Sequence, residues 1–449
     1  MTIFVLVIGI IGYTYLPWFT SLSALSAGDW PYLFIEQIRE FSWAPEARFL
    51  WLSPYYQIFT KFVVTVLGIR WEIAEKILWF LPFIIIAATT SYHAFRSWIA
   101  VLVYTTNTYI LMIVGGGQMG VAMAYALAPW VFNRLSFLSI AIGAMFDPRI
   151  TLLTVIASLF VTRPNVKKLL LPFLGVLVIH LYWIIPVLRL PSEITQRLSQ
   201  VNTGILEFLS FATFSQTISL LHPNWPENIF GKVYFMQPEF LLIPIVAFSV
   251  FLFGDQKKKA IPYGLLALAG AFLAKGTQEP FGGIYEWLFT YIPGFWLFRD
   301  STKFYLFVAL AYSYLISKTK IPSLLIVVLW AVLIRQAIAH ELTGTFQPEP
   351  IDPEYIKLKE LILSSGKSPT FWVPAVSRYA FFTKEHPAIA GEIGSHGYAI
   401  VPFDSREEIF LTERTYDDTL RQELIASMSA LQNLERDPTF TKLAVWKIK

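Results

Sequence analysis

The sequence predicts a polytopic helical membrane protein with a small water-soluble domain at its C-terminal end. Of the 449 residues, 55% are hydrophobic and only 15% are charged, and the mean hydropathy is +0.55. A soluble protein of this length would carry about a quarter charged residues. Repeated apolar segments of membrane-spanning length complete the prediction of an all-α membrane domain.

Two further features of the sequence limit its chemistry and processing. The chain contains no cysteine, which excludes disulfide bonds and thiolate metal sites. The first apolar segment, near residues 3–22, has no basic region before it and no small-residue cleavage site after it. We therefore interpret it as a retained membrane helix and not as a cleaved signal peptide.

Charge and hydropathy divide the chain into two parts. Residues 1–339 hold 23 Lys and Arg against 15 Asp and Glu, a net charge of +8, whereas residues 340–449 hold 12 against 16, a net charge of −4. The apolar segments also stop near residue 339. We predict a transmembrane domain over residues 1–339, a proline-containing linker over 340–353 and a soluble extracytoplasmic α+β domain over 354–449.

About eleven membrane spans are predicted, and their orientation follows from the loop charges. With the N-terminus in the cytoplasm, the short outside loops carry little more than Arg149 and Lys275. The predicted inside loops carry Arg96, Arg134, Arg163 with Lys167 and Lys168, Lys257–Lys259, and Lys318 with Lys320. This arrangement places a multi-pass protein in the plasma membrane with its C-terminal domain outside. The predicted spans are 3–22, 77–92, 97–114, 119–133, 135–146, 149–162, 168–188, 239–253, 260–274, 303–317 and 321–339.

Long connections on the predicted outer side carry the candidate site residues. The first of them includes residues 53–69, which are apolar enough to be a span. Counting them as a span would move Lys257–Lys259 outside, so we predict an interfacial helix instead, anchored by Tyr55, Tyr56 and Trp71. The three connections cover residues 25–76, 189–238 and 275–302.

Asp29 is the first candidate site residue, in the stretch SAGDWPY that follows the first apolar segment. One interpretation is a general base, because partial burial raises the pKa of a carboxylate towards the range in which it takes a proton from a hydroxyl. The other is the N-cap of a helix that begins at Trp30, with Pro31 in the favoured first turn. The residue types alone leave both interpretations open.

A second candidate site lies in PGFWLFRDSTKF, residues 293–304. Arg299 and Lys303 are four residues apart, so they share one face if the stretch is helical. Two cations at the interface suit the phosphate of a lipid-linked substrate, with Arg as a fork and Lys as a point charge. Asp300 is an accessory candidate that would cap this helix. Cations that reach from a helix end to the membrane surface explain the same residues equally well.

Asp147 and Arg149 form a possible accessory site where two short apolar segments meet at Pro148. A broken backbone at membrane depth is tolerated where it is buried in protein or lines a cavity, and an ionisable residue there is a site candidate. An internal ion pair between Asp147 and Arg149, or a plain helix-hairpin turn, is the alternative.

The stretch LHPNWPEN, residues 221–228, supplies His222 and Trp225 as candidate acceptor-binding residues. Tryptophan faces stack on sugar rings, but tryptophan is also the ordinary anchor at a membrane interface. The remaining Asp, Glu and His residues show no metal-ligand spacing, so we predict no metal site. No nucleic-acid partner is expected.

Several of these motifs together resemble the GT-C superfamily of membrane glycosyltransferases, in its YfhO-like and arabinofuranosyltransferase branches. The likeness rests on an acidic residue after the first span and on interfacial helices in the first outer loop. It also rests on NTYILMIVGGGQMGVAMAYALAPW (Asn107–Trp130), which looks like the third and fourth spans of the family, and on PGFWLFRDSTKF. The C-terminal stretches WVPAVSRYAFFTKEHPAI and LAVWKIK are similar to soluble tails in such proteins.

The resemblance implies an inverting glycosyltransferase that takes a sugar from a polyprenyl-phosphate donor. The acceptor would be a glycan, lipid or protein of the cell envelope, and membrane lipid would surround the enzyme. By carry-over, Asp29 would be the base, and Arg299 with Lys303 would contact the donor phosphate. The chain departs from the protein mannosyltransferases because Trp30, not a second acidic residue, follows Asp29. It also lacks the acidic cluster of the oligosaccharyltransferases, so no divalent-metal cofactor is indicated.

Two functions outside enzymology fit the same composition. A lipid or glycan transporter or flippase often shows broken helices and charges at the membrane midplane. Here the candidate charges gather at the outer interface, which favours chemistry at the surface. A non-catalytic membrane scaffold would keep the architecture without needing an ionised Asp29.

Overall fold

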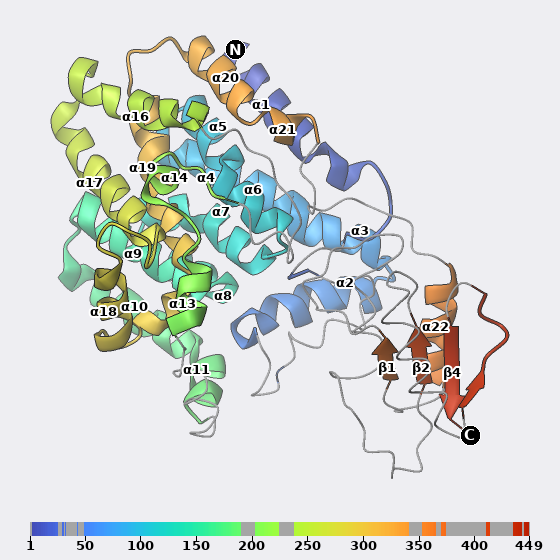
Figure 1. The fold of residues 1–449 in the computed structure, drawn as a ribbon. Coiled ribbons are helices and arrows are strands. Elements are labelled where there is room, and N and C mark those ends of the chain that lie inside the picture. Colours follow the sequence, from blue (N-terminus) through green and yellow to red (C-terminus); the bar gives the residue numbers. More distant parts are fainter. Residues whose placement is uncertain are drawn as a thin grey trace.

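The computed structural model is built almost entirely of helices, as the sequence predicts for the membrane part. It describes residues 2–25, 29–30, 32, 43, 49–189, 203–223, 238–340, 353–364, 370–373, 410–413, 434–441 and 444–448. Figure 1 shows most of the helices gathered in one bundle, with the short strands apart from it near the C-terminus. The mostly helical character predicted for residues 1–339 is therefore confirmed for the described residues.

The described residues form the following α-helices, in chain order. In the first half of the chain they are α1 (Thr2–Tyr15), α2 (Phe62–Thr65), α3 (Trp71–Glu75), α4 (Leu81–Phe95), α5 (Trp98–Thr106), α6 (Thr108–Gly115), α7 (Met119–Asn133), α8 (Phe137–Phe146), α9 (Pro148–Thr162), α10 (Leu170–Ile179) and α11 (Leu181–Leu188). In the second half they are α13 (Thr203–Leu209), α14 (Phe214–Ile218), α16 (Leu242–Phe253), α17 (Lys257–Ala274), α18 (Gly282–Tyr291), α19 (Tyr305–Ser317), α20 (Ser323–Leu333), α21 (Arg335–Ile338) and α22 (Pro353–Ser364).

Helix α19 occupies the centre of the bundle and packs against α5, α9, α16 and α17. Its residues are apolar or aromatic on every side and nearly all are buried, which is the pattern of a helix surrounded by other helices. Gly270 of α17 allows the closest approach, because a Cβ there would lie 2.6 Å from Cβ of Phe307. The two helices therefore pack at a distance that only glycine permits at this position.

The segment predicted as one span over 97–114 is broken at Asn107. Helices α5 and α6 meet there at an angle of 43°, and Asn107 itself has an extended backbone. Its side chain satisfies both helix ends: Oδ1 accepts from the N–H of Ile110 at 3.2 Å, and Nδ2 donates to the carbonyl oxygens of Val103 and Tyr104. A buried asparagine thus replaces the backbone hydrogen bonds that the break removes.

The polar residues on either side of this break bind the neighbouring helices. Thr105 to Thr108 are all buried, and each supplies a backbone or side-chain partner to another element. The contacts are Tyr15 Oη to Thr105 O (2.6 Å), Trp330 Nε1 to Thr106 Oγ1 (2.9 Å), Asn107 Nδ2 to Tyr125 Oη (2.9 Å), Thr108 Oγ1 to Leu220 O (2.8 Å) and His222 N to Thr108 Oγ1 (2.6 Å). The break therefore joins α1, α7, α20 and the loop after α14.

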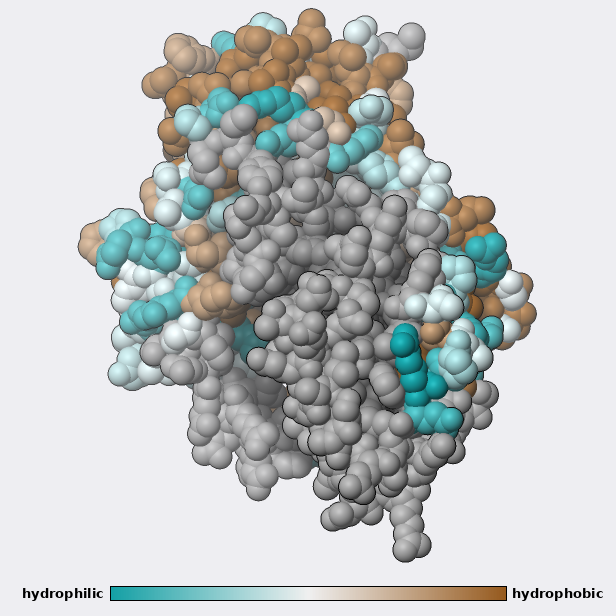
Figure 2. All heavy atoms as spheres, turned by 45° about the vertical axis from the view of Figure 1, so that its right-hand side comes forward, coloured by the Kyte–Doolittle hydropathy of each residue, from teal (hydrophilic) through white to brown (hydrophobic). Residues whose placement is uncertain are grey.

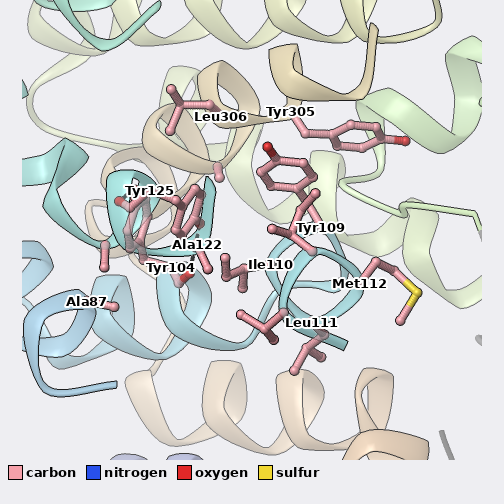
Figure 3. Close-up of a cluster of buried hydrophobic side chains, with 14 of the residues drawn as sticks. Ala87, Tyr104, Tyr109, Ile110, Leu111, Met112, Ala122, Tyr125, Tyr305 and Leu306 are labelled. Carbon is pink, nitrogen blue, oxygen red and sulfur yellow. Dashed lines mark hydrogen bonds between the residues drawn. The ribbon is translucent and has the colours of Figure 1, made fainter. Parts of the chain in front are cut away.

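An aromatic core lies beside the same break. Tyr104 and Tyr125 stack with their ring centroids 4.2 Å apart, and each hydroxyl donates to the backbone carbonyl of the other residue. Tyr109 packs edge-on against Tyr125 and stacks on Tyr305 of α19 at 5.6 Å, and Figure 3 shows these side chains together. These rings form a continuous series of contacts from the helix break at Asn107 to Tyr305 at the start of α19.

Membrane-spanning length is met by two of the described helical segments, Thr2–Phe19 and Trp71–Phe95. Two bent pairs, α5 with α6 and Lys167–Ile179 with α11, raise the number to four if each pair is one span. The other apolar helices are shorter. The structure is compatible with a membrane protein, and the count of eleven spans stays a prediction.

Apolar side chains cover much of the exposed surface at one end of the molecule, the top of Figure 2. Helices α1 and α20 lie at this end in Figure 1 and expose Val5, Leu324, Leu325 and Val328, each by more than half of its surface. Helix α10 likewise exposes most of its leucines. Such surfaces are stable in lipid and not in water.

The stretch predicted as an interfacial helix does form a helix, from Tyr55 to Thr65. It exposes Ile58 and Phe59. Two of its predicted anchors are wrong, however: Tyr56 and Trp71 are buried, and the indole of Trp71 donates to the carbonyl of Tyr32 at 3.1 Å. Trp71 thus holds the backbone of Tyr32 against the bundle, and the position of the helix at a membrane surface stays a prediction.

The C-terminal part contains α22 and a four-stranded sheet of order β1-β2-β4-β3. The strands are β1 (Thr370–Val373), β2 (Phe410–Glu413), β3 (Leu434–Arg436) and β4 (Ala444–Ile448). β1 runs parallel to β2, and the other two pairs are antiparallel. Glu354 of α22 accepts hydrogen bonds from Thr441, which attaches the helix to the sheet end. These elements have the α+β character predicted for residues 354–449, and the domain boundary stays a prediction.

We expect Asn107→Leu to lower the free energy of unfolding by about 2 kcal/mol, because leucine keeps the size of asparagine but leaves the N–H of Ile110 and the hydroxyl of Tyr125 short of a partner. Thermal unfolding in detergent measures the change. Thr89→Val is the matched control, since the exposed Thr89 hydroxyl bonds only to carbonyls of its own helix. Equal stability of the two variants would contradict this role of Asn107.

Candidate functional site

Asp29 lies in a turn that docks on the connection between α6 and α7. Its backbone N–H donates to the carbonyl of Gly116 at 2.8 Å, and its side chain is partly exposed. Neither Trp30 nor Tyr32 is helical, so the predicted N-cap of a helix beginning at Trp30 is wrong. The backbone conformation at Asp29 is set by the hydrogen bond to Gly116 and by the burial of Trp30. These contacts outweigh the local preference for a helix N-cap.

Glu75 also binds the loop that contains Asp29, through Leu25 and Trp30. The sequence analysis did not identify this residue. Its carboxylate is fully buried and accepts from the N–H of Leu25 at 2.7 Å and from the indole N–H of Trp30 at 3.1 Å. The adjacent Lys76 donates to the carbonyl of Ser23. The available signal was a Glu-Lys pair at the start of an apolar segment, where a charge must find a partner.

Asp147 and Arg149 form the internal ion pair that was one of the two interpretations of this turn. Arg149 Nη2 lies 2.6 Å from Asp147 Oδ2, and the carboxylate also caps α9 by accepting from the N–H of Arg149 and of Ile150. Burial alone would raise the pKa of Asp147, but the guanidinium outweighs burial and holds this pKa below its usual value. Asp147 is therefore a charged helix cap.

Arg299 and Lys303 do not share a helix face, so that expectation is wrong. The stretch forms two 3₁₀ turns, Phe295–Phe298 and Ser301–Phe304, with an extended Asp300 between them. A 3₁₀ turn aligns residues three apart, which brings Lys303 to Asp300 and leaves Arg299 exposed. Lys303 Nζ lies 2.5 Å from Asp300 Oδ2, and both residues are buried.

Asp300 caps the second of these turns. Its Oδ1 accepts from the N–H of Thr302 at 3.1 Å and from the Thr302 hydroxyl at 2.6 Å. Burial would raise the pKa of Asp300, but the ammonium of Lys303 and the Thr302 donors keep it below the usual value. The carboxylate of Asp300 is thus ionised at neutral pH and faces the Lys303 side chain.

The two ion pairs and His222 act on one another electrostatically, although they come from three separate parts of the chain: the turn between α8 and α9, the loop after α14, and the stretch between α18 and α19. The charge of Lys303 helps to lower the pKa of Asp147, and the charges of Asp300 and Lys303 both act on His222. The rings of Tyr109, His222 and Tyr305 lie between 5.2 and 5.9 Å from one another. The fold therefore gathers these groups at one end of the bundle.

The cluster of Tyr109, His222 and Tyr305 contains a buried hydroxyl group, that of Tyr109. Tyr109 is fully buried, and within the described part of the chain its Oη has no hydrogen-bond partner. Figure 3 shows its ring beside Tyr305, near the start of α19. Sequence reasoning missed both tyrosines, because an apolar helix with occasional tyrosines looks like ordinary core.

Asp29 and Asp147 are both tied to the start of α7. Asp29 bonds to Gly116, and Gly120 approaches the carbonyl of Phe146 so closely that a Cβ would lie 3.1 Å from it. Four residues of chain span at most about 14 Å. Asp29 is therefore held at the same end of the bundle as the ion pair of Asp147.

His222 is buried and neutral near pH 7. Burial lowers its pKa to about 4, against the opposing effect of Asp300. Its backbone N–H bonds to Thr108, which fixes the loop after α14 on the helix break. Trp225, the other candidate of this stretch, lies outside the described residues. No three His, Asp or Glu side chains gather as metal ligands within the described ranges.

Comparisons of the chain with protein-family models, with curated proteins and with solved structures find no match. The chemistry of the site therefore has to be inferred from the residues that the fold brings together. These are a partly exposed carboxylate on a fixed loop, two buried ion pairs and a buried tyrosine hydroxyl.

We expect Asp300→Asn to destabilise the protein by about 3 kcal/mol or more, because asparagine keeps the cap on Thr302 but leaves the Lys303 ammonium buried without its counter-ion. Adding Lys303→Met should restore most of the loss. Thermal unfolding of the single and double variants in detergent measures both effects. If the double variant is no more stable than the single one, the unpaired charge is not the cause.

The lowered pKa of His222 makes the free energy of unfolding depend on pH. The unfolded chain binds a proton at this residue below about pH 6.5, whereas the folded state resists it until about pH 4. The stabilisation is thus complete above pH 6.5 and falls by at most roughly 3 kcal/mol as the pH drops to 4. We expect His222→Gln to flatten the dependence of the melting temperature on pH in this window. An unchanged slope would contradict the assignment.

Proposed function

We propose that the chain is an integral-membrane inverting glycosyltransferase that uses a polyprenyl-phosphate sugar donor. The acceptor is a glycan, lipid or protein hydroxyl on the outer side of the membrane. The single observation that carries the proposal is the placement of Asp29: a partly exposed carboxylate on a fixed loop, at the same end of the bundle as the buried ion pairs. The resemblance of the sequence motifs to the GT-C superfamily supports it.

In this reaction the carboxylate of Asp29 takes the proton of the acceptor hydroxyl. The acceptor oxygen forms its bond to the anomeric carbon while the bond from that carbon to the phosphate oxygen breaks. The polyprenyl phosphate leaves with the electron pair, and Asp29 then passes the proton to water. Because phosphate is already a good leaving group, the protein has to supply position and one base.

Arg149 is better suited than Lys303 to meet the donor phosphate. Its Nε and Nη2 bind Asp147, so the other edge of the planar guanidinium faces away from that pair. About a quarter of its side chain is exposed, whereas the Lys303 side chain is almost wholly buried against Asp300. Arg299, which is exposed, stays a candidate for contact with the donor phosphate from the surface of the protein.

The proposed topology places these groups outside the membrane. The N-terminus is cytoplasmic, the chain crosses about eleven times, and the C-terminal domain lies outside. The support is the distribution of Lys and Arg over the loops, which one orientation satisfies throughout.

A lipid or glycan transporter is the second candidate function. The bent pairs at Asn107 and His180, with angles of 43° and 67°, favour it, since transporters bind their substrates at discontinuous helices. The break at Asn107 is filled by protein contacts, and at His180 the imidazole bonds to the carbonyl of Ala141 and the indole of Trp183. Both breaks are thus satisfied within the fold, which favours the enzyme.

We expect Asp29→Asn to abolish sugar transfer, with a loss of about 100-fold or more, because the amide keeps the size of the carboxylate but cannot take a proton. Membranes containing either protein are supplied with radiolabelled polyprenyl-phosphate sugars. Asp255→Asn, an exposed carboxylate paired with Lys320, is the matched control and should transfer normally. Transfer by Asp29→Asn at the wild-type rate would remove Asp29 from the site, and no transfer by wild type with any donor would favour the transporter.

The topology is tested with single cysteines, since the chain has none of its own. Gly283 has open space around the position of its Cβ, so Gly283→Cys fits without strain. A membrane-impermeant maleimide added to intact cells should label Gly283→Cys, whereas the exposed Lys258→Cys should be labelled only after the membrane is opened. The reverse pattern would invert the proposed orientation.

A further inference from the structure

We propose that Glu75 is a positioning residue that sets the placement of the Asp29 carboxylate. Glu75 comes from α3, about 45 residues after the loop that it binds. This inference rests on the proposed function, in which Asp29 is the base. It adds a residue that neither the motifs nor the resemblance assigns.

Glu75 bonds to one residue before Asp29 in the sequence and to one residue after it. One carboxylate oxygen accepts from the backbone of Leu25, four residues before Asp29, and the other accepts from the indole of Trp30, the next residue. The neighbouring Lys76 adds a bond to Ser23. The loop is thus attached to α3 on both sides of Asp29.

A second attachment fixes Asp29 itself. Its own N–H bonds to Gly116 in the turn before α7, so the residue lies between two elements that do not adjoin in sequence. Trp30 adds ring contacts with Trp71 and Trp79, at centroid distances of 6.1 and 5.0 Å, and is 2% exposed. The backbone at Asp29 therefore has little freedom, while its side chain keeps access to solvent.

Two acceptor oxygens are needed at position 75, because both incoming groups are donors and each bonds to a different oxygen of Glu75. A glutamine amide has one acceptor oxygen and one donor nitrogen, so it satisfies only one of the two N–H groups. Loss of either bond releases one side of the loop. Displacing a catalytic base by about 1 Å costs roughly 100-fold in rate, so a small shift is enough to be measured.

The first test compares Glu75→Gln with Glu72→Gln. Glu72 lies one turn earlier on the same helix and pairs with the exposed Arg70 at 3.4 Å. Among the residues that the structure describes, its side chain makes no hydrogen bond to the loop, so it provides the same substitution as a control. We expect Glu75→Gln to lower kcat for sugar transfer about 10- to 100-fold with little change in KM for the donor, and Glu72→Gln to leave both unchanged. Trp30→Phe, which removes the indole N–H together with the five-membered ring, should change kcat in the same direction.

The second test does not depend on activity. Asp29→Cys is introduced into the cysteine-free chain with either Glu75 or Glu75→Gln, and the rate of maleimide alkylation of the folded protein is measured. We expect this rate to change several-fold in the Glu75→Gln background, while the rate at Gly283→Cys stays the same. The comparison reports the local placement of residue 29 and not global unfolding.

The two tests separate failure of this inference from failure of the proposed function. If wild type transfers sugar but Glu75→Gln keeps its kcat and its alkylation rate at position 29, Glu75 does not position the loop. The same holds if Glu75→Gln only lowers the melting temperature. If wild type transfers no sugar, the proposed function fails, and the alkylation rates alone decide whether Glu75 sets the placement of residue 29.

Discussion

The rest of the structure depends on how the chain satisfies its polar groups where the helix breaks at Asn107. A break in an apolar helix exposes backbone donors and acceptors that lipid cannot bond. Here the asparagine side chain bonds both helix ends, and the adjacent threonines bond to α1, α20 and the loop that carries His222. Helix α6 leaves this break at a new angle. It carries Tyr109 to α19 and ends in the glycine turn that receives Asp29.

The buried acidic residues of the site also have hydrogen-bond or ion-pair partners within the protein. In the part of the chain that the structure describes, each buried carboxyl group has a cation or several N–H donors: Asp147 has Arg149, Asp300 has Lys303, and Glu75 has two N–H groups of the loop after α1. A buried pair is costly to break and adds little net stability, so its value lies in fixing position. In the proposed reaction such fixed groups hold donor and base in place without reorganisation.

Composition and hydropathy predicted a mostly helical architecture, because hydrophobicity acts over whole segments, and local sequence patterns predicted the mixture of helix and strand near the C-terminus. The finer geometry depends on contacts between distant residues. Arg299 and Lys303 were predicted on one face by α-helical spacing, but two 3₁₀ turns with an extended Asp300 between them pair Lys303 with Asp300 instead. The N-cap interpretation of Asp29 failed because its partner, Gly116, is far away in sequence. Glu75 was missed for the same reason, since nothing near it in the chain shows that its partners are Leu25 and Trp30.

The central claim is that the loop of Asp29 docks on the turn between α6 and α7, and a cross-link tests it most directly. A hydrogen bond between the backbones of residues 29 and 116 brings their Cα atoms within the range that a disulfide requires. Gly116 has φ −79°, so a cysteine is tolerated there. Mild oxidation of the double variant Asp29→Cys with Gly116→Cys should give an intramolecular disulfide, whereas Asp29→Cys with Gly283→Cys should not. If the first pair stays reduced, or both pairs react alike, the loop does not dock at this turn and the proposed site is not assembled.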